Sequence, residues 1–394
     1  MTTDVKHDVV IIGAGLVGLA LAVALSRAGL SVAIVDRGCV AAADSPHDAG
    51  WDARVYAISP GSAEFLHECG VWQRLAAERM APIEAMEVFG DDDGRVRFDA
   101  YELGERALAW IVENRELNAP LVAALRADAG IEVLAPAHPT SIAWHAAHAE
   151  VGFEEGETIR ARLVVGADGI RSWARSEAGI DVEPRSYAQS GVVANFSTER
   201  PHRGRAFQWF IGDQGVIAWL PLPGKRMSMV WSAPDALARE LVALSAGELA
   251  QRVAQAGKST LGALEVITPA AAYPLAFLKL DSVIATRFAL IGDAAHGVHP
   301  LAGQGVNLGF GDTSALSKLL AARGPVTDVG APLLLRQYAL RRSAPVLAMQ
   351  VVTDGLVRLF DSPLPWVRSM RNRGMRAVDA IGPLKRLLSA PALR

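Results

Sequence analysis

The sequence predicts an α/β fold in which a parallel sheet is interrupted by an inserted antiparallel sheet and is followed by a C-terminal helical segment. Three observations predict it. The N-terminus reads as strand, glycine-rich turn, helix and strand, which is a βαβ unit. Two later apolar runs, 162–165 and 288–291, are each followed by glycine and aspartate, as expected of buried parallel strands. Residues 190–232 instead alternate between turn residues, which is typical of antiparallel strands.

The composition is that of a globular protein with a large apolar interior. The chain has 394 residues, of which 51% are hydrophobic and 21% are charged, enough for one large or two ordinary domains. The formal net charge of −3 gives no sign of nucleic-acid binding. The only cysteines, Cys39 and Cys69, exclude a disulfide framework and favour an intracellular protein.

An uncharged apolar run, residues 9–25, is close to the shortest length that spans a membrane. The residues before it are mixed in charge, unlike the basic start of a signal peptide. The run contains three glycines at ordered spacing, and a second short apolar strand follows it. We therefore expect a strand and a helix here rather than a membrane span or a signal peptide.

The remaining elements follow from the same patterns. We expect strands at 9–12 and 31–35, helices at 16–28, 60–80, 114–129 and 307–320, short strands between 83 and 100, and meander strands at 192–197, 206–211, 216–220 and 227–231. Trp209, Trp219 and Trp231 fall in the meander strands. We expect them in the core, and the alternative is that some line a substrate cavity.

Residues 13–18 form the pattern G-x-G-x-x-G between the first strand and the first helix. The first glycine allows the tight turn, the second lets backbone approach a pyrophosphate, and the third packs helix against strand. The free N–H groups of the helix start would bind the diphosphate. Asp36 ends the second strand, where it would accept a hydrogen bond from a ribose hydroxyl. This context predicts a Rossmann-like dinucleotide site but does not distinguish FAD from NAD.

The C-terminal half favours FAD. Gly292 and Asp293 follow a strand, and a glycine-rich segment, residues 299–312, then leads into a helix without a second G-x-G-x-x-G unit. A helix start directed at the flavin ring would stabilise the negative charge that develops there on reduction. Asp293 could bind ribityl or ribose hydroxyls.

Several segments together resemble the ubiquinone-biosynthesis hydroxylases, which are class A FAD-dependent monooxygenases related to 4-hydroxybenzoate hydroxylase. Residues 299–312 match the signature of that family at every position. The other segments are G-D-A-A-H-x-x-x-P at 292–300, G-A-D-G-x-x-S-x-x-R at 166–175, D-x-R at 52–54 and N-R-E-L at 114–117. The resemblance runs from about residue 8 to residue 345.

This resemblance implies a discontinuous domain arrangement. The Rossmann-like FAD-binding domain would comprise residues 1–75, 105–180 and 280–325, because the elements of parallel-sheet type occur in three stretches. The inserted antiparallel β-sheet domain, residues 80–104 and 185–279, would bind substrate. Residues 330–394 would form the C-terminal helical segment.

The resemblance also implies roles residue by residue. For Asp168 with Arg171 the alternative is a turn cap beside an exposed arginine, and for Asp52 with Arg54 it is a surface ion pair. The catalytic candidates are His299, Pro300 and Gln304, with backbone positioning as the alternative role, and no metal ligands are expected. The residues expected to bind FAD are Gly13, Ala14, Gly15, Gly18, Asp36, Arg37, Arg54, Arg115, Asp168, Gly292, Asp293, Gly303, Gln304, Gly305, Val306 and Asn307.

The activity that the resemblance implies is hydroxylation of an aromatic ring with NAD(P)H and dioxygen, through a C4a-hydroperoxyflavin. We expect the substrate to be a polyprenyl-phenol intermediate of ubiquinone biosynthesis. A soluble phenolic-acid hydroxylase of aromatic catabolism is the alternative, and an NAD-dependent dehydrogenase, which would be colourless, is a more distant one. The site must exclude water, so we expect an apolar wall from the meander.

The C-terminal segment is basic. Residues 341–394 carry ten Lys or Arg and three Asp or Glu, and apolar residues such as Val367, Met370, Leu384 and Leu387 recur at near-helical spacing. A basic amphipathic helix suits a membrane surface. We expect a cytoplasmic protein in peripheral contact with the inner face of the cytoplasmic membrane and with a ubiquinone-biosynthesis protein complex. The alternative is a helix that packs on the protein with a basic solvated face.

Overall fold

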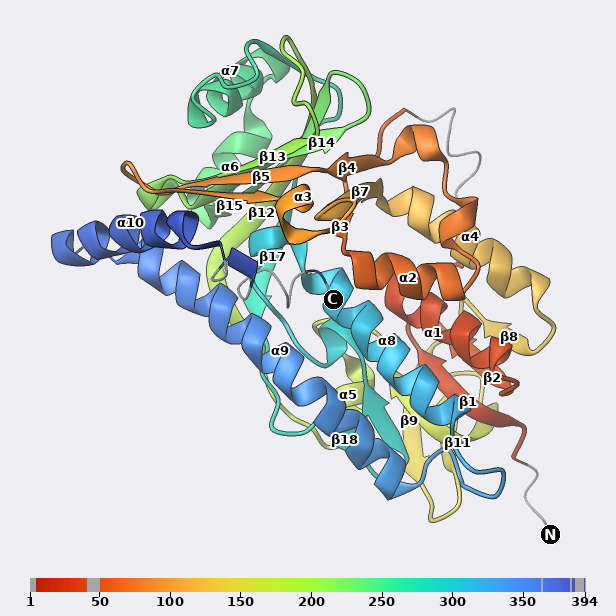
Figure 1. The fold of residues 1–394 in the computed structure, drawn as a ribbon. Helices are drawn as coiled ribbons and strands as arrows, with labels where there is room; N and C mark the ends of the chain where they lie inside the picture. Colours follow the sequence, from red (N-terminus) through yellow and green to blue (C-terminus); the bar gives the residue numbers. More distant parts are fainter. Residues whose placement is uncertain (1–4, 41–49, 363, 383–384, 387–392, 394) are drawn as a thin grey trace.

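The computed structural model describes residues 5–40, 50–362, 364–382, 385–386 and 393 of the chain. Its strands form two large sheets and one small sheet (Figure 1). The apolar run at residues 9–25 is divided between a strand, β1 (His7–Ile12), and a helix, α1 (Leu16–Arg27). Within the described ranges, no helix combines the length and apolar character that a membrane crossing needs.

The first large sheet has eight strands in the order β18-β19-β11-β1-β2-β8, with β10 beside β11 and β9 beside β10. The neighbours from β19 to β8 are parallel. β1, β2 and β19 are short apolar runs whose residues are almost all buried, as parallel strands covered on both faces require. The bounds are β2 Val32–Val35, β8 Ile131–Leu134, β9 Pro139–Trp144, β10 Ala149–Phe153, β11 Thr158–Gly166, β18 Ile284–Ala285 and β19 Phe288–Leu290.

Three helices cover one face of this sheet: α1, α4 (Asn114–Ala127) and α8 (Gly305–Ala321). The approach of α8 to α1 depends on Gly309, because a Cβ there would lie 2.6 Å from a methyl group of Val17. The helix expected at 60–80 is wrong beyond residue 68. Helix α2 (Pro60–Glu68) ends before Gly70, whose φ of 72° stops it, and short 3-10 turns, Trp72–Arg74 and Ala77–Arg79, follow.

The second large sheet has the order β16-β12-β15-β14-β13-β5-β6, with β17 also paired to β12. The meander is confirmed for β13, β14 and β15, but β12 pairs with β15 rather than with β13. Trp209, Trp219 and Trp231 lie in its core, which confirms the expected placement. The bounds are β5 Ala85–Phe89, β6 Arg95–Asp99, β12 Arg185–Thr198, β13 Arg205–Phe210, β14 Val216–Leu222, β15 Arg226–Pro234, β16 Leu264–Val266, β17 Ala271–Phe277, and for the covering helices α6 Asp235–Ala243 and α7 Ala246–Ala256.

The small sheet and several short helices connect these parts. Its order is β3-β7-β4, which sequence patterns did not indicate. The bounds are β3 Val55–Ile58, β4 Ala81–Ile83, β7 Ala109–Glu113, α3 Ala100–Leu103, α5 Trp173–Glu177, and for the 3-10 turns η3 Gly212–Gln214, η4 Gly292–Ala294 and η5 Leu301–Gly303.

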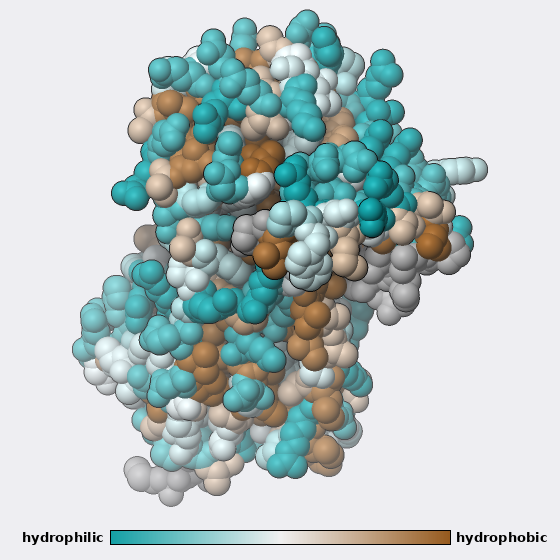
Figure 2. All heavy atoms as spheres, turned by 90° about the vertical axis from the view of Figure 1, so that its left-hand side faces the viewer, coloured by the Kyte–Doolittle hydropathy of each residue, from teal (hydrophilic) through white to brown (hydrophobic). Residues whose placement is uncertain are grey.

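Two C-terminal helices, α9 (Pro332–Asp361) and α10 (Pro365–Ala380), follow (Figure 1). Helix α9 packs along α8, and α10 contacts β6 at the edge of the second sheet. The surface in Figure 2, on the side where these helices lie, mixes hydrophobic with hydrophilic residues. Exposed apolar side chains of the two helices include Leu340, Leu347, Val351, Trp366 and Met370. Leu384 and Leu387 of the expected amphipathic pattern lie outside the described residues.

Candidate cofactor-binding and active site

The segments that carry the sequence motifs meet at the carboxyl ends of neighbouring strands. The N–H of Ala167, just after β11, donates to the carbonyl of Ile12 at the end of β1 at 2.7 Å. The N–H of Ile291, just after β19, donates to the carbonyl of Gly166 at 3.0 Å. Open α/β sheets bind their ligands at this edge, so the topology places the motifs where a cofactor would lie.

The three motif glycines have different surroundings. Gly13 has a φ of 109°, and a Cβ there would lie 2.5 Å from the carbonyl oxygen of Ala167. A Cβ on Gly18 would lie 2.0 Å from the carbonyl oxygen of Gly13, so helix and turn touch at backbone distance. A Cβ on Gly15 would meet nothing within 4 Å, and no side-chain hydrogen bond caps α1 at this residue. Gly15 therefore leaves open backbone at a helix start, as phosphate binding requires.

Asp36 shapes the loop beside this turn. One carboxylate oxygen accepts from the N–H of Ala14 and the other from the N–H of Gly38, both at 2.7 Å. The adjoining cavity has a volume of about 260 Å³ and is lined by Ala14, Gly15, Asp36, Cys39, Val40, Asn118 and Val122. Its position beside the glycine turn suits the adenosine half of a dinucleotide.

Arg37 and Arg115, both expected to bind FAD, lie in different environments. Arg37 is exposed, and its guanidinium lies 6.0 Å from the ring centre of Trp173. Arg115 is half-buried near the start of α4, with its Nε 3.9 Å from the carboxylate of Glu113. That Nε is buried and has no hydrogen-bond partner among the described residues. Arg115 thus retains a donor for an anionic group.

The surface ion pair considered for Asp52 and Arg54 is wrong. The carboxylate of Asp52 accepts from the backbone N–H groups of Arg54, at 3.0 Å, and Arg115, at 3.2 Å, so it ties the loop before β3 to the start of α4. The guanidinium of Arg54 instead lies over two aromatic rings, 5.4 Å from the centre of Tyr56 and 5.5 Å from that of Tyr273. Both tyrosines were missed from sequence, since a lone Tyr in a strand carries no signal.

Asp293 combines an exposed side chain with close charged neighbours. Its side chain is exposed to solvent, yet surrounding protein displaces enough water to raise its pKa, while His296 and Arg54 lower the pKa by their charge. Burial likewise raises the pKa of Tyr56 to about 12, with Arg54 opposing the shift and Asp293 adding to it. Asp293 is therefore accessible to a ligand.

The start of α8 is held against β3 and exposes part of its backbone. Gly303 has a φ of 63°, and a Cβ on Gly305 would meet nothing within 4 Å. Asn307 ties this helix start to β3, since its amide donates to the carbonyl of Ala57 at 2.8 Å and accepts from the N–H of Ser59 at 3.0 Å. No side chain of the described residues caps the first turn, which includes the half-buried Val306. The first N–H groups of α8 are thus available to an electron-rich ligand edge.

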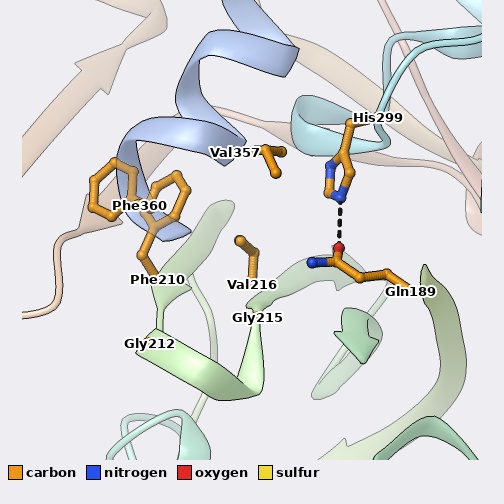
Figure 3. A pocket seen from close by; sticks show the side chains of 8 residues that line it. All are labelled: Gln189, Phe210, Gly212, Gly215, Val216, His299, Val357 and Phe360. Atoms are coloured by element: carbon orange, nitrogen blue, oxygen red, sulfur yellow. Dashed lines mark hydrogen bonds between the residues drawn. The ribbon is translucent and has the colours of Figure 1, made fainter. Parts of the chain in front are cut away.

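His299 is buried and both ring nitrogens contact protein groups. Its Nε2 lies 3.0 Å from Oε1 of Gln189, and its Nδ1 accepts from the N–H of Leu301 at 3.4 Å (Figure 3). Burial lowers the pKa of His299 to about 4, so the imidazole is neutral near pH 7 and donates through Nε2. This geometry gives His299 a positioning role, and nothing in it directs a free nitrogen at a substrate.

Pro300 and Gln304, the two other catalytic candidates, also make hydrogen bonds within the loop before α8 and its first turn. The carbonyl of Pro300 accepts from the N–H of Gly303 at 2.8 Å. The side chain of Gln304 is buried, and its Oε1 accepts from the amide of Asn307 at 3.3 Å. Direct catalytic roles for these residues stay predictions.

A narrow pocket lies beside His299, between the second sheet and α9 (Figure 3). The rings of Phe210 and Phe360 stack on each other at one side of it, with centres 3.6 Å apart. Its volume is about 10 Å³, room for about one water molecule, and it is lined by Gln189, Phe210, Gly212, Gly215, Val216, His299, Val357 and Phe360. The meander thus supplies part of a mostly apolar wall.

Asp168 caps a helix. Its carboxylate accepts from the hydroxyl of Ser172 and, at 3.0 Å, from the N–H of Ala174 at the start of α5. Arg171 is exposed, so the turn-cap arrangement is the one present, and a cofactor role for Asp168 stays a prediction. Arg175, to which the sequence assigned no role, is buried and donates to the carbonyl of Ala294 at 3.1 Å.

These residues fit FAD. Uncapped helix starts with open glycine backbone lie at Gly15 of α1 and Gly305 of α8, and the turn that carries the exposed Asp293 contacts both helices, at Val17 and Gly309. Among the described residues, no group of three or more His, Cys, Asp and Glu side chains could hold a metal ion. A parallel sheet with these two sites and an inserted antiparallel sheet defines the FAD-dependent monooxygenase class.

Comparison with known proteins supports that class and identifies the family. The FAD binding domain family matches residues 6–353. A probable FAD-dependent monooxygenase of Pseudomonas aeruginosa, PqsL, superposes with a TM-score of 0.78 at 25% identity, over 94% of this chain and 99% of that one. The p-nitrophenol monooxygenase PnpA of Pseudomonas putida has the same fold, with a TM-score of 0.77 at 19% identity over 98% of each chain.

Curated relatives extend along the whole sequence. The ubiquinone hydroxylase UbiL of Rhodospirillum rubrum is 37% identical over 100% of this chain and 90% of its own length. The 3-demethoxyubiquinol 3-hydroxylase of Escherichia coli is 36% identical over 98% of this chain and 97% of its own length. The chain belongs to the FAD-dependent monooxygenases of the ubiquinone-biosynthesis hydroxylase family, as the motifs predicted. FAD is its cofactor, and NAD(P)H is the co-substrate typical of the family.

Proposed function

We propose that this protein hydroxylates the ring of a polyprenylated phenol in ubiquinone biosynthesis. The observation that carries the proposal is the full-length similarity to hydroxylases named for ubiquinone and demethoxyubiquinol. A soluble phenolic-acid hydroxylase is not favoured. The curated relatives that match nearly the whole chain are named as hydroxylases of ubiquinone or demethoxyubiquinol, and neither is named for a phenolic acid.

FAD, when bound, supplies the redox and oxygen chemistry. The protein binds and orients the cofactor and excludes water from the site. The start of α1 at Gly15 would hold the pyrophosphate, and Asp293 would accept from hydroxyls of the chain that links it to the flavin. The start of α8 would face the ring edge where negative charge develops. Buried His299 and Asn307 hold the α8 loop in place through Gln189 and Ala57, so this helix start keeps its orientation.

The test is genetic complementation with identification of the product. Strains that each lack one ring hydroxylase receive the gene, and the quinone intermediates that accumulate are identified by mass spectrometry. The proposal predicts that one such strain regains ubiquinone and loses its accumulated intermediate. Failure in every strain, with the flavin-loaded protein present, would contradict the substrate class while leaving the flavoprotein assignment intact.

We also propose that the protein is cytoplasmic and contacts the inner membrane face through α9 and α10. Exposed apolar side chains such as Leu347 and Trp366 support this, together with the exposed arginines 336, 341 and 373, which form no ion pair among the described residues. Other basic residues of α10 serve packing instead: Arg371 pairs with Asp91 in the turn between β5 and β6. The expected basic face is therefore smaller than the charge count suggested.

Vesicle flotation tests this contact. We expect wild-type protein to float with vesicles that contain anionic phosphatidylglycerol, and a Leu347→Ser, Trp366→Ser double variant to stay in solution, because buried apolar area drives such binding. Val326→Ser, a change of a still more exposed apolar side chain in the loop before α9, serves as the control. Equal flotation of all three proteins would count against the contact.

We also propose that the protein associates with other ubiquinone-biosynthesis proteins. Co-purification of those proteins with the same variants measures this association.

A further inference from the structure

A buried ionic network lies beneath the Gly292–Asp293 turn and is not used by any role assigned above. The carboxylate of Asp312 on α8 is 1% exposed and contacts three donors, two from the 292–296 segment and one from α9. Nε2 of His296 lies 2.6 Å from one oxygen, which also accepts from the N–H of Gly292 at 2.9 Å. Nε of Arg342 on α9 donates to the other oxygen at 2.6 Å.

The chain makes room for this arrangement. A Cβ on Gly311 would lie 2.9 Å from the guanidinium of Arg342, so a larger residue there would displace the arginine. Arg342 also donates to the carbonyl of Leu308 at 3.0 Å, and Tyr338, one turn earlier on α9, donates to the carbonyl of Leu290 at 2.7 Å. Helix α9 is thereby connected to both α8 and the end of β19. Buried ions are costly to desolvate, and in this network each buried charge faces a charge of opposite sign.

One polar atom of the network remains without a partner. Nδ1 of His296 is buried and makes no hydrogen bond within the described residues. The charged groups that face this imidazole are Asp312 from α8, Arg342 from α9 and Asp293 from the turn itself, and Arg54 in turn faces Asp293. Charge interactions thus connect Arg342 on α9, through Asp312 and His296, with the exposed carboxylate of Asp293.

We propose that His296, Asp312 and Arg342 are positioning residues that hold the Gly292–Asp293 turn, and with it the Asp293 carboxylate, in the geometry that FAD binding requires. The inference deepens the cofactor assignment and rests on it. Asp312 anchors the turn directly through the N–H of Gly292, and His296, when protonated, carries a positive charge that attracts the carboxylates of both Asp312 and Asp293. FAD affinity therefore depends on side chains that need not touch the cofactor.

The pH dependence follows from the same contacts. Burial lowers the pKa of His296, but the charge and hydrogen bond of Asp312 outweigh it, so the pKa lies above the usual 6.5. The imidazolium therefore persists to a higher pH than in an ordinary histidine and is lost as the pH rises through this raised pKa. FAD should bind more weakly above that pH than below it.

Flavin fluorescence during titration of the apoprotein measures FAD affinity. We expect Asp312→Asn and His296→Gln to weaken FAD binding about tenfold or more at neutral pH, as loss of a charge-assisted hydrogen bond would. We also expect His296→Gln to remove the decrease in affinity that wild type shows with rising pH. Asp328→Asn is the matched control, since its carboxylate also lies 2.6 Å from an arginine, Arg287, but at the opposite end of β19.

The outcomes are distinguishable. Variants that lower the melting temperature but bind FAD with wild-type affinity and wild-type pH dependence would overturn the proposal, because the network would then be structural only. If Asp312→Asn does not fold, His296→Gln alone decides, since it keeps a neutral hydrogen-bonding side chain of similar size. A wild-type chain that binds no FAD would refute the cofactor assignment first, before any variant is compared.

Discussion

At the scale of single residues, Gly15 and Gly18 belong to one motif but serve different physical purposes. A Cβ at Gly18 would collide with the carbonyl of Gly13, whereas one at Gly15 would enter open space. We predict that Gly18→Ala loses at least about 1–3 kcal/mol of unfolding free energy through overpacking. Gly15→Ala should keep the wild-type melting temperature and lose FAD affinity. Thermal unfolding and FAD titration of both variants separate the two effects, and equal melting temperatures would contradict the packing account.

His299 gives a second prediction at this scale. An unfolded imidazole takes up its proton near pH 6.5, but folded His299 does so only near pH 4. Below the first value the unfolded chain binds more protons, so stability decreases as the pH falls from about 6.5 to about 4, by about 3 kcal/mol from this residue. In urea unfolding with excess FAD, His299→Gln should lose less stability over this range than wild type. A parallel decrease in both proteins, with exposed His67→Gln as control, would refute the buried neutral imidazole.

Residue types were predictable from sequence, but many of their partners were not. The motif glycines, Asp36 and Asp293 all lie along one sheet edge because the spacing of motif and strand determines that placement. Asp312 was part of the recognised signature, yet its contact with Arg342 depends on how α9 returns across α8. The partner of His299, Gln189, is 110 residues away in sequence and follows no pattern. Contacts of this kind require the tertiary structure.

At the scale of elements, the contacts of Arg371 anchor α10 to the turn between β5 and β6. Arg371 is buried, pairs with Asp91, and donates to the carbonyl of Leu359 at 2.7 Å at the end of α9. We predict that Arg371→Met weakens this helix by about 1–3 kcal/mol, because buried acceptors lose their donor. Hydrogen exchange of α10 amides should accelerate, while Arg373→Met, an exposed neighbour, should leave it unchanged. Unchanged exchange in both variants would show that these contacts do not hold α10.

Elements with strong local patterns were predictable, and those determined by tertiary contacts were not. The strands and helices near the motifs fall where the apolar periodicity indicated, within a few residues. The helix after Pro60 ends early because Gly70 takes a left-handed conformation, which sequence alone did not distinguish from a helical glycine. The pairing of β12 with β15 joins residues about forty apart, and side-chain alternation predicts that a strand exists but not its neighbour.

At the scale of the whole molecule, the two large sheets divide the work. The parallel sheet carries the backbone and carboxylates that we expect to bind the cofactor, and the antiparallel sheet with α9 supplies the largely apolar wall beside His299. Helix α9 contributes to both parts. Its Arg342 pairs with Asp312, which binds the Gly292–Asp293 turn, and its Val357 and Phe360 line the pocket beside His299. The proposed activity requires both parts, because oxygen transfer to a ring needs a bound flavin and a site from which water is excluded.

The most direct test follows the oxygen atom. Purified, FAD-loaded protein is supplied with NAD(P)H, a short-tailed prenyl phenol and isotopically labelled dioxygen, and the product is analysed by mass spectrometry. The account predicts a yellow protein that places one labelled oxygen atom in a new ring hydroxyl. A colourless protein that gains no flavin, or a product whose new oxygen comes from water, would contradict it.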